Sequence, residues 1–158
     1  MNRSFRTQQG SFLLEALIAI LIVALGVLGS VGLLARSMQD MDDARNRGEA
    51  AYLANQVIGQ MWVANRTTAN LDTEYSSALG SGAGYNEFKN LVFQRLPNAD
   101  KYTQDIVVGP GPMPANLSSS MVSITVQWCP PGEYNGAVCR GPADRPHVYN
   151  VTAAIGAN

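Results

Sequence analysis

The stretch that decides the fold runs from Ser11 to Ala35 and reads SFLLEALIAILIVALGVLGSVGLLA. From Phe12 onward this stretch carries a single charge, that of Glu15. Roughly 20 apolar residues in a helix cover the hydrocarbon core of a bilayer, which is about 30 Å thick. The stretch is therefore predicted to be a membrane-spanning helix.

The ten residues before this stretch are polar and include two positive charges, Arg3 and Arg6. Basic residues beside a span favour the cytoplasmic side, so the N-terminus is expected to stay inside while everything after the span is exported. A cleaved secretory signal is the alternative, with a weak cleavage site at the small residues around Ser30 and Gly32. The apolar core of such a signal is about 7 to 15 residues long and usually uncharged, which argues against it here.

Glu15 is unusual because an acidic side chain inside a bilayer span costs a few kcal/mol. Cleavage after Gly10 would offset this cost, since it creates a protonated α-amine at Ser11. The amine of one subunit would then neutralise the glutamate of its neighbour when helices pack in a dry bundle. A glycine also lets the backbone enter a protease cleft in extended form. The simpler alternative is a glutamate that is tolerated at the membrane interface, in contact with water.

The residues around the expected cut read Gln9-Gly10-Ser11-Phe12-Leu13-Leu14-Glu15-Ala16-Leu17-Ile18-Ala19. This string resembles the prepilin leader junction of the type IV pilin family. The resemblance implies that residues 1–10 are a basic leader, that prepilin peptidase cuts after Gly10, that Ser11 is the N-methylated terminus and that Glu15 guides subunits into a fibre. Many pilins start the mature chain with Phe, whereas Ser comes first here. Within the family, this core and the following Leu25-Gly26-Val27-Leu28-Gly29 look like the minor pilins called PilV, or type IV pilus modification proteins.

The helix is expected to continue to about Trp62, because the first proline is Pro97 and apolar residues recur at spacings near 3.6. Residues 11–35 form its membrane-spanning and polymerisation half. Three glycines (Gly26, Gly29 and Gly32) lower the helix stability of this half, since each costs roughly 1 kcal/mol relative to alanine. The alternative explanation for these glycines is that small residues allow helices to pack closely. Residues 36–65 form an amphipathic half whose stripe packs on the protein's own sheet. The stripe consists of Met38, Met41, Ala44, Ala51, Ala54, Ile58 and Met61.

The remainder of the chain predicts a loop, a short helix and a small antiparallel sheet. Within residues 66–101, the segment up to Gly84 is rich in Asn, Thr, Ser, Gly and Ala, which favours a loop, and Tyr85–Leu96 is expected to be a helix that stops before Pro97. Residues 102–158 contain alternating apolar and polar residues, separated by turn formers that favour a meander. The predicted strands are Tyr102–Val108, Met121–Cys129 and His147–Ile155.

Cys129 and Cys139 are the only cysteines, and they lie close together among turn-forming residues. Outside the cytoplasm this spacing suits a disulfide that closes a loop of about ten residues, worth about 2 to 3 kcal/mol in the chain-entropy model. A zinc site would need two further ligands. The sole histidine, His147, cannot complete a tetrahedral set without a carboxylate, so no metal site is predicted.

Charge and motifs disfavour two further classes of function. The chain has 11 Lys and Arg against 12 Asp and Glu, a net charge of −1, so it lacks the basic field that holds a nucleic acid. It contains no nucleophile elbow, phosphate loop, zinc-protease motif or EF-hand pattern, so neither an enzyme nor a cofactor is expected. Its Pro-rich and Gly-rich loops and Tyr134 are exposed candidates for contact with other proteins.

The sequence thus predicts an α+β, type IV pilin-like chain and, by resemblance, a minor pilin that takes part in pilus assembly or priming, or in adhesion or motility at the tip. It would sit in the inner membrane as a single-pass protein with a periplasmic head before it enters the extracellular fibre. Expected partners are other minor pilins, the major pilin, prepilin peptidase, the inner-membrane assembly platform and membrane lipid. Two alternatives remain: a minor pseudopilin of a type II secretion system, and a membrane-anchored periplasmic domain that never polymerises.

Overall fold

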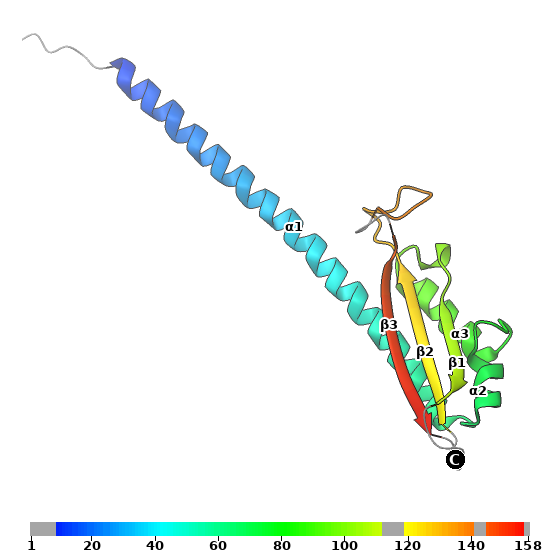
Figure 1. Cartoon of the computed structure of the whole chain (residues 1–158). Helices are drawn as coiled ribbons and strands as arrows, with labels where there is room; N and C mark the ends of the chain where they lie inside the picture. Colours follow the sequence, from blue (N-terminus) through cyan, green and yellow to red (C-terminus); the bar gives the residue numbers. More distant parts are fainter. Residues whose placement is uncertain (1–8, 112–118, 141–144, 157–158) are drawn as a thin grey trace, which may run out of the picture. The chain divides into compact units, whose positions relative to one another are not determined.

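The computed structural model describes residues 9–111, 119–140 and 145–156. The chain is α+β, with a long N-terminal helix and a small three-stranded antiparallel sheet, as predicted. It divides into two compact units, Met1–Asp42 and Asp43–Asn158. The elements are α1 (Gln9–Val63), α2 (Thr68–Tyr75), α3 (Ala83–Arg95), the 3-10 helix η1 (Ala99–Lys101), β1 (Asp105–Pro110), β2 (Ser119–Trp128) and β3 (His147–Gly156) (Figure 1).

Helix α1 is continuous over 55 residues, within two residues of the predicted bounds at each end. It packs into the core of the second unit through side chains that are at most 2 % exposed: Ala50, Leu53, Ala54, Val57 and Met61. Steps of three and four residues keep these side chains on one face of the helix.

The predicted stripe on α1 is right for Ala54 and Met61, and Ile58 packs at the edge of the core. It is wrong for the residues before Ala50, since Met38 and Met41 are 66 % and 69 % exposed and Ala44 is also exposed. Fully buried positions on α1 begin only at Ala50, so the apolar side chains earlier in the helix do not belong to the core of the second unit. Ala51 is half-buried because it follows Ala50 by one residue, about 100° around the helix axis.

The sheet has the order β1-β2-β3, with both pairs antiparallel, which is the meander that the turn formers favoured. In β2 the predicted alternation is confirmed: Val122, Ile124, Val126 and Trp128 are fully buried. The centre of the sheet aligns Ile106, Ile124 and Val151 across the three strands. These positions place one apolar face of the sheet against the helices.

The first strand lies further along the chain than predicted. Residues 99–101 form η1, so β1 begins at Asp105 rather than Tyr102. It then includes Gly109 and Pro110, which belong to the turn-forming run Gly109-Pro110-Gly111-Pro112 that the sequence predicts as a connection between strands. Pro112 lies outside the described residues. Proline is tolerated at the end of this strand because β1 is an edge strand and need not donate to a second neighbour.

The predicted loop before Gly84 contains a helix, α2, and this prediction was therefore wrong. Only Leu71 and Tyr75 of its eight residues are buried, so the apolar pattern is too sparse to predict it. Contacts with the sheet hold it instead: Thr68 Oγ1 lies 2.8 Å from Ser120 Oγ, and Ser77 N–H donates to the Ile106 carbonyl just after the helix.

Helix α3 begins two residues before the predicted helix and ends one residue before it, with Leu96 as its C-cap. Phe88 and Val92 point into the core, and Leu96 is buried as well. The buried residues of α1, α2, α3, η1 and the three strands form one hydrophobic cluster. The second unit thus has a single core of its own.

Candidate functional site

The first candidate site is the apolar part of α1. The large apolar side chains between Phe12 and Leu34 are 48 % to 74 % exposed. The most apolar 18-residue window of the helix has a mean hydropathy of 2.8, and none of that window is buried. One helix near the N-terminus is therefore long and apolar enough to cross a membrane. Such a continuous apolar surface indicates an environment of lipid or other helices.

Glu15 lies on this surface with an exposed side chain. Its neighbours on either side, Leu13, Leu14 and Leu17, are all more than 60 % exposed, so the carboxylate is surrounded by apolar side chains. No ion pair found within residues 9–111, 119–140 and 145–156 includes Glu15. A carboxylate that enters an apolar medium is costly unless a cation pairs with it.

The predicted cleavage residues, Gly10 and Ser11, lie in the first turn of α1. The first turn of a helix has N–H groups without intrahelical acceptors, and helix ends fray. A peptidase would therefore need to unwind only this turn to reach the bond after Gly10. Ser11 precedes Glu15 by four residues, so the new terminus and the acid would belong to the same region of the helix.

The apolar part of α1 also contains a hydroxyl whose hydrogen bond is made within the helix. Ser30 Oγ donates to the Gly26 carbonyl at 3.0 Å, which satisfies the serine without water. A Cβ added at Gly26, Gly29 or Gly32 would meet nothing within 4 Å. These glycines are thus not required by packing within the chain itself.

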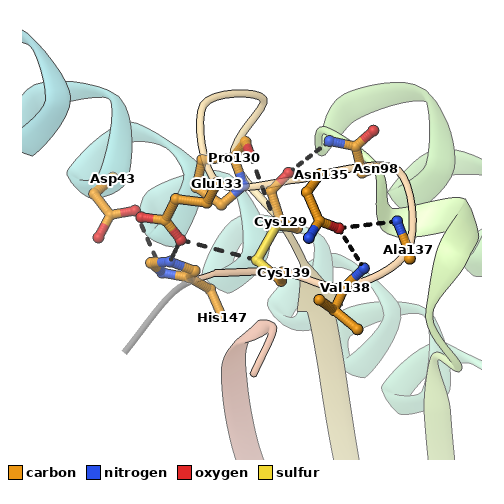
Figure 2. The surroundings of a disulfide bond; sticks show 10 residues. All are labelled: Asp43, Asn98, Cys129, Pro130, Glu133, Asn135, Ala137, Val138, Cys139 and His147. Atoms are coloured by element: carbon orange, nitrogen blue, oxygen red, sulfur yellow. Dashed lines mark hydrogen bonds and ion pairs between the residues drawn. A yellow bond between two sulfur atoms is a disulfide. The ribbon is translucent and has the colours of Figure 1, made fainter. Parts of the chain in front are cut away.

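The second candidate site is the loop that follows β2, shown in Figure 2. Cys129 and Cys139 lie at disulfide distance, as predicted, with their Cα atoms 5.7 Å apart. Within the loop, Asn135 Oδ1 accepts hydrogen bonds from the N–H groups of Ala137 and Val138, and Gly136 has a φ of 91°, a conformation that favours glycine. The loop is thus an ordered turn between two linked cysteines.

Backbone contacts fix both ends of this loop. Cys129 N–H donates to the Pro97 carbonyl at 3.1 Å, and Asn98 Nδ2 donates to the Cys129 carbonyl at 2.9 Å. Asn98 has a left-handed conformation with a φ of 51°, which asparagine adopts more readily than most residues. At the other end, Arg140 N–H donates to the Glu133 carbonyl at 2.8 Å.

His147, at the start of β3, contacts two carboxylates, one in the loop and one on α1. Its side chain is only 4 % exposed. Nε2 lies 2.8 Å from Glu133 Oε2, and Nδ1 lies 3.3 Å from Asp43 Oδ1 on α1. The same Glu133 oxygen lies 3.8 Å from Cys139 Sγ (Figure 2). The imidazole therefore connects the loop, the sheet and the helix.

Comparison with protein-family models, with curated proteins and with solved structures gives no match. Function must therefore be argued from the two candidate sites themselves.

The sequence identified Cys129, Cys139 and His147 but missed Glu133 and Asp43. Glu133 could have been identified from the sequence, since it is the one acidic residue between the two cysteines. Asp43 could not have been identified, because it is one of several acidic residues in a charged stretch of α1 and only the tertiary fold brings it to His147. The sequence indicated that His147 could not complete a tetrahedral set without a carboxylate, and the structure places the Glu133 carboxylate beside it.

Proposed function

We propose that this chain is a minor subunit of a type IV pilus, made with a leader that ends at Gly10 and anchored by α1 until it enters the fibre. The observation that carries the proposal is the position of one acid. Glu15 is the only charge on an exposed apolar helical surface, and it would be the fifth residue of the chain that starts at Ser11. The α+β fold, with a long N-terminal helix and a three-stranded sheet, supports it.

Pairing of charges between subunits explains how this arrangement drives assembly. A buried carboxylate without a partner costs several kcal/mol, whereas a well-placed cation offsets most of that cost. The α-amine at Ser11 of one subunit is such a cation, and it exists only after cleavage. Packing of α1 against other helices then covers the apolar surface and neutralises Glu15 in the same step.

The expected topology follows from the same residues. Arg3 and Arg6 favour a cytoplasmic N-terminus, so the unit that contains the sheet would be periplasmic before assembly. A disulfide between Cys129 and Cys139 suits that oxidising compartment. The partners would be other pilins, prepilin peptidase, the assembly platform and membrane lipid. We propose a structural role rather than a catalytic one.

The N-terminus of the mature protein is the first test of this proposal. Mass spectrometry of the chain purified from membranes and from sheared pili should find Ser11 as the first residue, with a methyl group on its amine. A protein that still begins with Met1 would contradict the proposal and would indicate a membrane-anchored domain that does not polymerise.

The second test replaces Glu15. Glu15→Ala and Glu15→Gln should leave the amount in the membrane unchanged but lower the amount in sheared pili by about tenfold or more, since a lost interaction of about 1.4 kcal/mol already changes an equilibrium tenfold. Quantitative immunoblots of both fractions measure this. The matched control is Asp40→Ala, which removes an exposed acid from a later part of the same helix and should assemble normally. Normal incorporation of Glu15→Gln would exclude the charge-pairing mechanism.

The minor pseudopilins of type II secretion use the same N-terminal chemistry, and a deletion strain distinguishes the two assignments. Loss of surface pili with normal secretion supports the pilus subunit. Loss of secretion with normal pili would replace it with the pseudopilin.

A further inference from the structure

The two cysteines of the disulfide and the Glu133 carboxylate form a cluster of metal-binding donor atoms, and His147 contacts this cluster through Glu133. Cys129 Sγ, Cys139 Sγ and one Glu133 carboxylate oxygen lie within 4.8 Å of one another. His147 Nε2 lies 2.8 Å from Glu133 Oε2. We propose that reduction of the Cys129–Cys139 disulfide creates a zinc site in which Cys129, Cys139, Glu133 and His147 are the four ligands.

The donor set matches the chemistry of zinc. Zn²⁺ prefers four ligands in a tetrahedral arrangement and accepts thiolate, imidazole and carboxylate together. Zn–S bonds of about 2.3 Å at tetrahedral angles require two sulfurs about 3.8 Å apart. The Cα atoms of the cysteines are 5.7 Å apart, so the two sulfurs can separate by rotation of their side chains once the covalent bond is broken.

The orientation of His147 provides independent support. A histidine that binds zinc through one ring nitrogen commonly donates the other N–H to a carboxylate, which fixes the tautomer and the ring plane. Here Nε2 faces the loop, while Nδ1 lies 3.3 Å from Asp43 Oδ1. The Trp128 ring packs beside the imidazole, with ring centroids 5.8 Å apart. The ring is thus already held with Nε2 toward Glu133, and a zinc ion bound by Glu133 would lie beside that nitrogen.

The backbone around the ligands is also fixed. Cys129 and Cys139 are at most 2 % exposed, and Glu133 is held by hydrogen bonds of its N–H to Pro130 and of its carbonyl to Arg140. Only the carboxylate of Glu133 is partly open to solvent, at 34 % exposure. An ion would therefore enter on the side of Glu133, and the dry side of the site would hold the sulfurs.

The chemistry requires a reductant and releases protons. A dithiol reduces the Cys129–Cys139 disulfide to two thiols and is itself oxidised to a disulfide. Binding of Zn²⁺ then displaces one proton from each thiol to solvent, and the oxidation state of zinc does not change. The same loop is thus closed either by a covalent S–S bond or by a metal ion, depending on the thiol state of the surroundings. This inference uses only the second unit and does not depend on the pilus assignment.

Titration of the full-length protein in detergent micelles with Co²⁺ tests the proposal. After reduction and removal of the reductant, the chain should bind one Co²⁺ with the intense visible absorption of tetrahedral thiolate coordination, and Zn²⁺ should displace it. Bound zinc should also protect both thiols from alkylation. The oxidised chain should give no such absorption.

Matched variants assign the ligands. Glu133→Gln and His147→Ala should weaken Zn²⁺ binding at least tenfold, and Asp43→Asn should weaken it about tenfold through the orientation of the ring. Asp42→Asn, which changes the exposed acid beside Asp43, should bind like the wild type. Conservation of the tetrahedral Co²⁺ spectrum in both Glu133→Gln and His147→Ala would overturn the assignment.

The folded state of the reduced chain gives a second measurement. If reduction unfolds the sheet, zinc should restore its circular dichroism, because metal binding and folding are coupled. A reduced chain that binds no Co²⁺, that binds it only with the weak absorption of octahedral coordination, or that stays unfolded with zinc would overturn the proposal.

Discussion

At the scale of single residues, Gln104 holds together three segments of the chain. Its side chain is almost fully buried, with 1 % exposure. The amide nitrogen donates to the carbonyls of Ala99, Tyr102 and Gln127, and the amide oxygen accepts from Gln127 N–H at 2.8 Å. One polar side chain thus satisfies backbone groups of η1, of the segment before β1 and of β2. Buried backbone groups of this kind are costly when left without a partner.

Gln104→Ala should therefore destabilise the second unit by about 2 to 4 kcal/mol, since several buried polar groups lose their partners together. Urea unfolding followed by tryptophan fluorescence measures this. Gln94→Ala is the matched control, because Gln94 is an exposed glutamine on α3 and its change should cost less than about 0.5 kcal/mol. Equal stability of the two variants would show that the Gln104 network does not hold the sheet.

Ionisation of Tyr85 is expected to lower the free energy of unfolding at alkaline pH. Its hydroxyl donates to the Gln104 carbonyl at 2.8 Å. Burial raises the pKa of the Tyr85 phenol above its ordinary value of 10.0, and the negative charge of Asp105 adds to the rise. The folded chain thus holds the phenol proton more tightly than the unfolded chain. This contribution is complete below pH 10 and is lost as the pH rises through the higher pKa of the folded state.

The free energy of unfolding should accordingly change little between about pH 8 and pH 9 and fall above about pH 10. Tyr85→Phe should be less stable at neutral pH, because it lacks the hydrogen bond, but should lose less stability above pH 10. Tyr52→Phe, at a tyrosine that is 57 % exposed, should keep the wild-type dependence. A series of urea midpoints against pH measures all three, and the same alkaline slope in Tyr85→Phe and the wild type would refute the assignment.

The sequence did not predict which carboxylates contact His147. The two cysteines and the histidine could be identified because their residue types are rare in this chain. Glu133 and Asp43 belong to a common residue type, and their role depends on distances of 2.8 and 3.3 Å to His147. Such distances follow from three elements packing together, which no local pattern encodes.

At the scale of secondary-structure elements, α2 and α3 approach each other so closely that two positions require glycine. A Cβ at Gly82 would overlap the backbone of Glu74, and a Cβ at Gly84 would overlap the ring of Tyr75. In contrast, a Cβ at Gly59 on α1 would meet nothing within 4 Å. Gly82, just before α3, and Gly84, in its first turn, therefore fix the distance of α3 from α2, whereas Gly59 has no such role.

Alanine substitutions at these glycines should have opposite effects on stability. Gly82→Ala should destabilise by about 1 to 3 kcal/mol, because the overlapping atom is backbone and cannot rotate away. Gly59→Ala should stabilise by up to about 1 kcal/mol, since Gly59 is an exposed interior position of a helix. Thermal and urea unfolding of both variants measure the difference. Changes of the same sign would show that the contact between α2 and α3 is not tight.

The elements that could be predicted are those whose own residues impose a strong period. The uninterrupted helix and the alternation in β2 are of this kind, and both are confirmed. Helix α2 has only Leu71 and Tyr75 as buried residues, so its pattern is too weak without the sheet beside it. The predicted stripe on α1 failed before Ala50 for a related reason, because the sequence does not reveal at which residue of the helix the core of the second unit begins.

At the scale of the whole molecule, the two units differ in how they bury apolar surface. The core cluster contains no residue before Ala50 within the part of the chain that the structure describes. The apolar side chains from Phe12 to Leu34 remain exposed. The second unit thus satisfies its own core, while the first requires lipid or other helices. This division is consistent with the proposed role, in which α1 passes from a membrane into a fibre while the second unit stays folded.

A fragment of residues 37–158 should therefore be a folded, soluble monomer without detergent, whereas the full chain should require detergent or lipid. This fragment keeps Asp43 and its contact with His147 within a helical segment. Its urea midpoint should match that of the full chain in micelles within about 1 kcal/mol, because the removed residues contribute nothing to the core. Light scattering after size exclusion and circular dichroism test both points. Aggregation or unfolding of the fragment would mean that the apolar half of α1 is needed for the stability of the second unit.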